Sequence, residues 1–382
     1  MKKILALIGI VAVVVTGYLA FTAVAPTSTV PVAVAAGPTY SAVVYVAGMG
    51  GHFAKADVVI DPSDEKAPVK IKDLDRVVIG DKEYATHDPR IDVNDPNTMF
   101  WSTYVPDKNK KIHVGKTNLK DGKVLQDVAL TPDPKAPAEK APAYCASGQS
   151  KGFYMPVFMG QEGYVDVIDK KDMSLKHRVW VSDLGYAKGT YKFTHGINSP
   201  DLKTFLLVLN QAKEGKGTGD IDFVLVDMAA LEQGKFKQVA KATLKGEPDK
   251  TITFRQYFTH DGKHILQSAG DRLWVVDAKT LAKVDEKMMP PGAQIHDAMP
   301  TPDNKFALLT VRNVTEGCDV EGKPIQKEGK TVDITDGVFM LYDASAKKLY
   351  EKNVSTCLGC HKGVGLGDKN AVLCGLDANY KK

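Results

Sequence analysis

The chain has 382 residues, of which 50 are basic and 46 acidic, so its formal net charge at neutral pH is +4. This near balance, with no basic stripe along the chain, argues against nucleic acid as a partner. Apolar residues make up 43% of the sequence. The part that follows a leader is therefore able to bury the core of one large domain or of two ordinary ones.

Residues 1–35 have the features of a secretory signal peptide or of an uncleaved membrane anchor. Lys2 and Lys3 precede an apolar run from Ile4 to about Ala25, and Ala33-Val34-Ala35 offers a cleavage site of the small-x-small type. The run is long for a signal peptide and close to the roughly 20 residues that a spanning helix needs. We favour export with cleavage. With or without cleavage, we expect the folded part to be periplasmic or otherwise extracytoplasmic, either soluble or anchored by this segment.

The region from Tyr40 to Ser355 repeats an apolar strand that ends in aspartate. Counting one weaker copy, the repeats follow one another at steps of about 50 to 66 residues. The copies are Val58–Asp61, the weaker Ile112–Lys116, Val165–Asp169, Phe223–Asp227, Leu273–Asp277 and Phe339–Asp343.

A tight turn before another apolar strand is the second repeated element. Examples are Ser199-Pro200-Asp201, Thr259-His260-Asp261-Gly262 and Thr301-Pro302-Asp303-Asn304. Short strands, regularly spaced turns and no long helical periodicity indicate an all-β fold. A repeat near 50 residues has room for four strands, so we expect residues 40–355 to form a six- to seven-bladed β-propeller rather than a β-sandwich. Six units are visible, and a seventh could be hidden between Pro62 and Pro142 or closed from both termini.

The segment Phe193–Asp201, followed by an apolar strand and Val224–Asp227, resembles the YVTN-type repeat. Similar propellers occur in cytochrome-linked nitrite reductases and in the heavy chains of amine dehydrogenases. The resemblance covers roughly residues 40–355 and implies the propeller fold far more strongly than an activity. In the nitrite reductases the c-type haem belongs to a complete cytochrome domain, whereas here only 21 residues follow His361.

Four histidines are predicted to surround one mouth of the central channel. His195 and His296 stand where the chain enters a blade, His87 occupies a similar place, and His52 ends a glycine-rich loop that can approach the axis closely. Imidazole rings that converge on one point bind transition metals or a haem iron. These four residues are therefore a candidate second metal or haem site, while a separate surface or capping role for each is the simpler alternative.

Residues 356–382 contain Cys357-Leu358-Gly359-Cys360-His361, the attachment signature of a c-type haem. Two thiols at this spacing reach the two vinyl groups of one porphyrin, and the histidine that follows binds the iron as proximal ligand. A thioredoxin-like cysteine pair is the alternative, but such a pair normally starts a helix in a βαβ unit. We expect one covalent haem c, held by Cys357, Cys360 and His361 on a short C-terminal haem-binding tail.

The sixth iron ligand and the disulfide pairing stay open at the sequence level. No His or Met follows His361, so a sixth ligand must come from the propeller or the tail, or be absent. Candidates are Met155, Met159, Met288, Met289, Lys362, Lys369 and Cys374. An oxidising compartment favours a disulfide between two of Cys145, Cys318 and Cys374, but spacing does not reveal which two.

Together these features predict an exported c-type cytochrome that transfers electrons through one haem to a periplasmic redox partner, alone or within a periplasmic oxidoreductase. Whether the chain is itself an enzyme is left open. One alternative is a propeller oxidoreductase with a second metal or haem at the four histidines. Another is a docking subunit of a redox complex, because propellers serve as interaction platforms.

Overall fold

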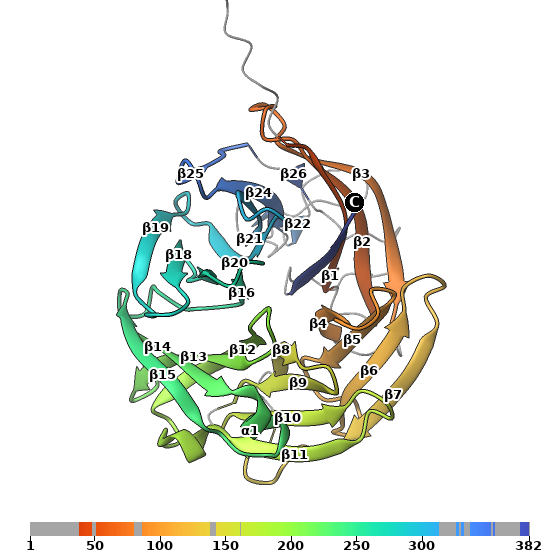
Figure 1. Ribbon diagram of the computed structural model, residues 1–382, viewed down its shortest axis with the longest axis vertical. Coiled ribbons are helices and arrows are strands. Elements are labelled where there is room, and N and C mark those ends of the chain that lie inside the picture. The colour runs from red at the N-terminus through yellow and green to blue at the C-terminus, as the bar shows by residue number, and fades with distance from the viewer. Residues whose placement is uncertain are drawn as a thin grey trace, which may run out of the picture. The chain divides into compact units, whose positions relative to one another are not determined.

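The computed structural model describes residues 38–47, 51–79, 86–137, 143–160, 162–312, 326–327, 330–331, 337–352, 354–355 and 375–381. Within these residues, six antiparallel sheets form the blades of a β-propeller around a central axis (Figure 1). The prediction of an all-β propeller is confirmed, with six blades, and the β-sandwich alternative is wrong.

Blades 1 to 3 each contain four strands, numbered from the axis outward as follows. Blade 1 consists of β27 (Leu376–Tyr380), β1 (Tyr40–Ala47), β2 (His52–Ile60) and β3 (Val69–Val78). Blade 2 consists of β4 (Thr86–Ile91), β5 (Thr98–Thr103), β6 (Ile112–Asn118) and β7 (Val124–Leu130). Blade 3 consists of β8 (Tyr144–Gln149), β9 (Phe153–Phe158), β10 (Tyr164–Asp169) and β11 (Leu175–Trp180).

Blades 4 to 6 follow the same plan. Blade 4 consists of β12 (Tyr191–Asn198), β13 (Thr204–Lys213), β14 (Lys216–Asp227) and β15 (Gln238–Lys245). Blade 5 consists of β16 (Gln256–Phe258), β17 (His264–Ser268), β18 (Arg272–Asp277) and β19 (Lys283–Met288). Blade 6 consists of β20 (Gln294–Pro300), β21 (Phe306–Arg312) and β24 (Gly337–Asp343), whose outer edge pairs with β25 (Lys348–Leu349) and β26 (Val354–Ser355). The remaining elements are the hairpin of β22 (Gln326–Lys327) and β23 (Lys330–Thr331), the 3-10 helix Val181–Leu184 and helix α1 (Met228–Glu232).

The two ends of the described chain close the ring inside blade 1. Strand β27 runs antiparallel to β1, from Leu376 opposite Val46 to Tyr380 opposite Ala42. Each inner strand contacts the next around the axis, and β20 contacts β27, which in turn contacts β4. The prediction of a separate tail over residues 356–382 therefore needs correction, because residues 376–380 are a structural strand of the propeller. The stretch from Pro62 to Pro142 contributes β3 and blade 2, and no additional blade.

Burial changes from the axis outward as a propeller requires. The inner strand β8 is buried at all six positions, whereas the outer strands β7, β15 and β19 alternate between more and less exposed residues. Outer strands have one face against their own blade and one in solvent, which produces this period of two.

The repeated strand–aspartate element is the third strand of a blade together with the turn that follows it. Asp277 after β18 and Asp343 after β24 accept hydrogen bonds from backbone N–H groups two and three residues later. Asp227 after β14 accepts from Ala230 N and so caps α1. An aspartate side chain stabilises a turn in this way, and the pattern recurs because each blade needs this turn.

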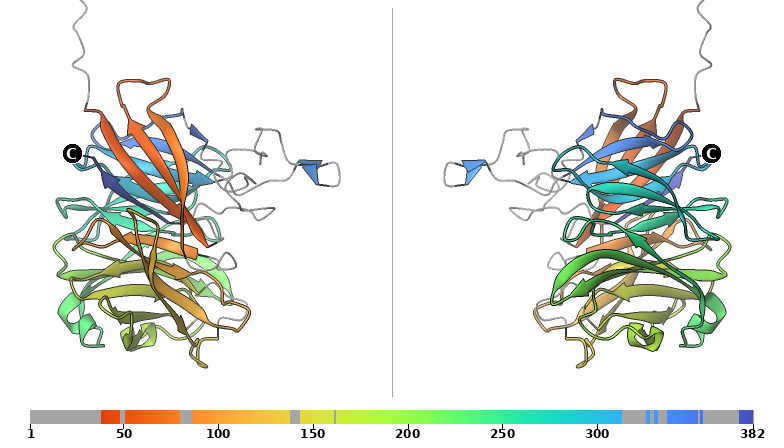
Figure 2. Two further views of the ribbon diagram at one scale, coloured as in Figure 1. Left: turned by 90° about the vertical axis from the view of Figure 1, so that its right-hand side faces the viewer. Right: turned by 90° about the vertical axis from the view of Figure 1, so that its left-hand side faces the viewer.

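We call the end of the propeller at which the inner strands begin the entry face. Because neighbouring strands in a blade are antiparallel, β21 ends on this face at Arg312 and β24 begins there at Gly337. Strand β26 also ends on it, since Ser355 pairs with Val338. Figure 2 shows from the side how the strands of the blades run between the two faces.

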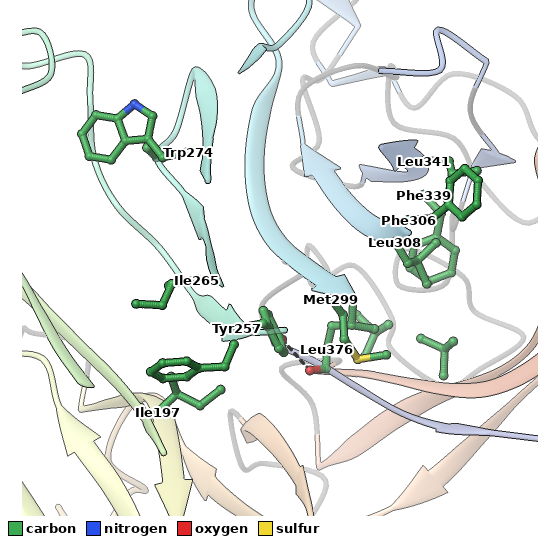
Figure 3. Packing of buried hydrophobic residues seen from close by; sticks show 14 of the residues in the cluster. Ile197, Tyr257, Ile265, Trp274, Met299, Phe306, Leu308, Phe339, Leu341 and Leu376 are labelled. Carbon is green, nitrogen blue, oxygen red and sulfur yellow. Dashed lines mark hydrogen bonds between the residues drawn. The ribbon is translucent and has the colours of Figure 1, made fainter. Parts of the chain in front are cut away.

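Apolar side chains from neighbouring blades fill the space between the sheets. The largest cluster includes Ile197 of β12, Ile265 of β17, Leu308 of β21 and Leu376 of β27 (Figure 3). Among the described residues, no helix has the length and apolar character needed to cross a membrane. The leader predicted over residues 1–35 lies outside the described residues.

Candidate functional site on the propeller axis

Polar side chains from the entry ends of all six inner strands gather around the axis. We call this set the axial cluster. Its members are Asp377 from β27, His87, Asp88 and Arg90 from β4, Cys145 from β8, His195 from β12, Arg255 immediately before β16, and His296 and Asp297 from β20. All except the half-buried Asp377 are buried. A buried group of titratable side chains at the centre of a propeller is the best candidate for a functional site in the described chain.

Irregular register at the start of four inner strands orients these side chains. The pairing of β4 with β5 shifts between His87 and Arg90, and Asp88 has a φ of 59°. The other three shifts lie at Cys145 in β8, between Tyr191 and Thr194 in β12, and at His296 in β20. A bulge turns an additional side chain out of the regular alternation, so these shifts explain how several polar groups reach the axis.

Charged members of the axial cluster form an alternating chain across three blades and the closing strand. The Arg255 guanidinium contacts Asp88, and its Nε lies 3.5 Å from Asp297 Oδ1. Arg90 lies 3.6 Å from Asp88 and 3.7 Å from Asp377. Since each charge is paired in a buried setting, removing one member leaves its partner uncompensated.

His87 has a fixed ring. Its Nδ1 lies 3.3 Å from the Cys145 carbonyl oxygen, which only accepts, so Nδ1 carries the proton. The Tyr104 ring stacks on it with centroids 4.7 Å apart. The opposite nitrogen, Nε2, is buried and has no hydrogen-bond partner within the described part of the chain.

The other two axial histidines lie on either side of Phe254. The Phe254 ring centroid is 4.9 Å from that of His296 and 6.4 Å from that of His195. His296 Nδ1 is 2.8 Å from Asp297 Oδ2. Both ring nitrogens of His195 are buried without a hydrogen-bond partner among the residues described.

All three axial histidines are neutral at physiological pH. Burial is the main cause, and neighbouring positive groups add to it. Together they lower the pKa of His87 well below its usual value, that of His195 to about 3 and that of His296 to about 4. A neutral imidazole has a lone pair on one nitrogen, which is the form that binds iron or another transition metal.

The structure thus brings His87, His195 and His296 to the axis but places His52 differently. His52 begins β2, the third strand of blade 1, and its carbonyl accepts a hydrogen bond of 3.2 Å from Thr86 Oγ1. Within the described residues, no group of three or more His, Cys, Asp and Glu side chains is arranged to hold a metal ion. A metal site made of all four histidines stays a prediction.

The haem-attachment motif lies outside the described residues, but both ends of its segment are fixed. Ser355 ends β26 on the entry face, and Gly375 precedes β27 on the same face. Gly375 has a φ of +87°, and a Cβ there would collide with Arg255, Pro89 and Asp88. The segment 356–374 therefore starts at the edge of blade 6 and returns to the propeller directly against the axial cluster.

The methionines proposed as iron ligands have ordinary structural positions. Met155 and Met289 belong to the apolar core, and Met159 is buried. Met288 is half exposed on the outer strand β19. Lys362, Lys369 and Cys374 lie outside the described residues, as does Cys318, so the pairing of the cysteines stays open.

Sequence reasoning missed the charged members of the axial cluster, although a signal for them exists. In five blades, the residue that opens the turn after the inner strand donates a backbone hydrogen bond to the start of the next strand. These residues are Asp92, Ser199, Thr259, Thr301 and Lys381. Four residues before each of them stand Asp88, His195, Arg255, Asp297 and Asp377. Aligning the repeats on this turn would have revealed one axial position that is polar in five of the six blades.

Neither a protein-family model nor a curated protein matches this sequence. Among solved structures, the periplasmic gluconolactonase PpgL of Pseudomonas aeruginosa is 14% identical, with a TM-score of 0.53, and the match covers 90% of this chain and 99% of that chain. The Dos1 propeller is 11% identical, with a TM-score of 0.44 and coverage of 80% and 67%. A chain of the mitotic checkpoint complex is 10% identical, with a TM-score of 0.46 and coverage of 89% of each chain. At this level of identity, the likeness to the gluconolactonase establishes the β-propeller fold and nothing further.

Proposed function

We propose that this protein is an exported c-type cytochrome in which a six-bladed propeller carries one covalently bound haem. The observation on which this depends is the sequence Cys357-Leu358-Gly359-Cys360-His361 in the segment that joins β26 to β27. When bound, the haem supplies reversible one-electron chemistry at its iron.

The architecture suits a haem held over the entry face. Cys357 is two residues beyond Ser355, so it stays within about 7 Å of the end of β26. Gly375 returns the chain to the axis beside Arg255 and Asp88. A porphyrin attached at Cys357 and Cys360 is thereby tethered on the face where the neutral histidines of the axial cluster lie.

The proposed partner is a periplasmic redox protein that exchanges single electrons with this haem, either directly or as another subunit of a complex. The leader of residues 1–35 and the haem motif both support a location outside the cytoplasm, because c-type haem is attached there. The similar propeller PpgL is itself periplasmic.

Covalent attachment is the first point to test. The protein should be produced with the haem maturation system and extracted with acid acetone, which removes only non-covalent haem. The colour should stay with the polypeptide, and the double variant Cys357→Ala/Cys360→Ala should lose it, while Cys145→Ser, which changes a cysteine outside the motif, should keep it. Complete extraction of haem from the unchanged protein would refute the proposal.

His361 is the proposed proximal ligand. Replacing it with alanine leaves both thioether bonds chemically feasible but removes a strong axial ligand. We expect His361→Ala either to fail in maturation or to contain high-spin haem without electron-transfer activity. An unchanged low-spin spectrum would show that the proximal ligand is misassigned.

A second candidate function is an oxidoreductase whose propeller holds an additional metal or haem. The observation that favours it is the presence of three buried, neutral histidines on the axis. Elemental analysis of the mature protein should then find more than one metal per chain, and the triple variant of His87, His195 and His296 to alanine should lose the excess. One iron per chain and no other metal would count against this function.

A further inference from the structure

We propose that His87 is the sixth ligand of the haem iron, bound through Nε2. This inference rests on the proposed covalent haem and names the propeller residue that completes its coordination. The iron would then be held between His361 of the attachment segment and a residue of inner strand β4.

The hydrogen bond of His87 is the one that an iron-binding imidazole needs. Histidines that bind metals usually donate the other ring N–H to a carbonyl or carboxylate, which fixes the tautomer and the direction of the lone pair. His87 donates Nδ1–H to the Cys145 carbonyl at 3.3 Å, and Tyr104 stacks on the ring. The lone pair is therefore on Nε2, and the ring is held before any ligand binds.

The unpaired Nε2 is a cost that iron binding would remove. A buried polar atom without a partner destabilises a protein by about 1–3 kcal/mol. His87 is fully buried, and its Nε2 has no hydrogen-bond partner among the described residues. Burial also keeps the imidazole neutral, so no proton competes with the metal.

The haem segment returns to the propeller beside His87. The backbone at Gly375 packs against Asp88 and Pro89, the two residues that follow His87. The register shift in β4 lies at these same residues, and the φ of 59° at Asp88 costs on the order of 1–3 kcal/mol. Distorted backbone that is maintained next to a buried, unpaired imidazole is typical of a ligand site.

The other axial histidines fit this role less well. Nδ1 of His296 is engaged with the buried carboxylate of Asp297, which is itself bound to Arg255, Tyr257 and Thr310. Neither nitrogen of His195 has a hydrogen bond, within the described part of the chain, that would fix the tautomer. A haem iron needs one imidazole from the propeller, because the porphyrin and His361 supply the other five donors.

The test uses the full-length protein after haem maturation. A pyridine haemochrome assay first measures covalent haem in each variant, and a wild-type protein without covalent haem would refute the proposed function itself. With haem present, we expect a low-spin ferric spectrum for wild type and a high-spin spectrum for His87→Gly. Added imidazole should restore the low-spin form of His87→Gly by filling the vacant position.

Two further variants guard against a purely structural effect. His195→Gly removes a buried axial histidine without removing the proposed ligand, and it should stay low-spin. His87→Met replaces one iron ligand by another, so it should stay low-spin, show a methionine–iron charge-transfer band and have a higher reduction potential. A low-spin His87→Gly protein without imidazole, or high-spin haem in His195→Gly but not in His87→Gly, would overturn the assignment.

Discussion

The closure of the ring by β27 predicts that the buried leucine at its start is important for stability. Leu376 has no exposed surface and belongs to the largest apolar cluster, and its carbonyl accepts a hydrogen bond of 2.6 Å from the Tyr257 hydroxyl (Figure 3). Leu376→Ala would remove the apolar contacts and leave a cavity where blades 1, 5 and 6 meet. Core leucine-to-alanine changes cost about 2–5 kcal/mol, so we expect a loss of about 3 kcal/mol.

The assay is equilibrium unfolding in urea, followed by circular dichroism and tryptophan fluorescence. Leu125→Ala is the matched control, because it makes the same chemical change at a leucine that is 42% exposed on the outer strand β7. The control should change the stability by less than about 0.5 kcal/mol. If Leu376→Ala unfolded at the same urea concentration as Leu125→Ala, β27 would not be the strand that holds the ring closed.

Three further predictions concern buried charges. Burial opposes protonation of His113, but its contacts with Asp127 and a second aspartate raise its pKa. This stabilisation is complete below about pH 6.5 and is lost as the pH rises through the raised pKa, so His113→Gln should flatten the fall in urea midpoint toward about pH 9. His195 has a pKa of about 3, so below about pH 6.5 only the unfolded chain binds its proton. His195→Leu should therefore remove a loss of about 1.4 kcal/mol per pH unit on acidification to about pH 4, and an unchanged acid profile would contradict the burial. Asp297→Asn leaves Arg255 short of a buried counter-charge and should cost about 3–5 kcal/mol in urea unfolding, whereas a cost below about 1 kcal/mol would show that the pair is solvated.

The strand and turn pattern was predictable because each signal is local. The aspartate that follows a third strand binds backbone N–H groups only two or three residues away, as Asp277 does. The turn at Ser199 is likewise stabilised by Asp201 and Thr204 within the same short segment. Such contacts are written in consecutive residues, so their repetition revealed both the all-β class and the propeller.

The candidate site was predictable only in part. His87, His195 and His296 could be placed near the axis because they precede recognisable turns. The prediction for His52 depended on the path of a loop, and the structure places that residue on a third strand. Arg255 and the aspartates around it were missed, because an isolated charged residue gives no sign in the sequence that it will be buried and paired.

By itself, the sequence determined the repeated blades, their turns and the haem-attachment motif, since each depends on neighbouring residues. Only the tertiary structure decided that there are six blades, that residues 376–380 close the ring and that Asp88 meets Arg255. The physical reason is distance along the chain. Residues far apart in the sequence come together only when the inner strands converge on one axis, and register shifts in those strands set which side chains point into it.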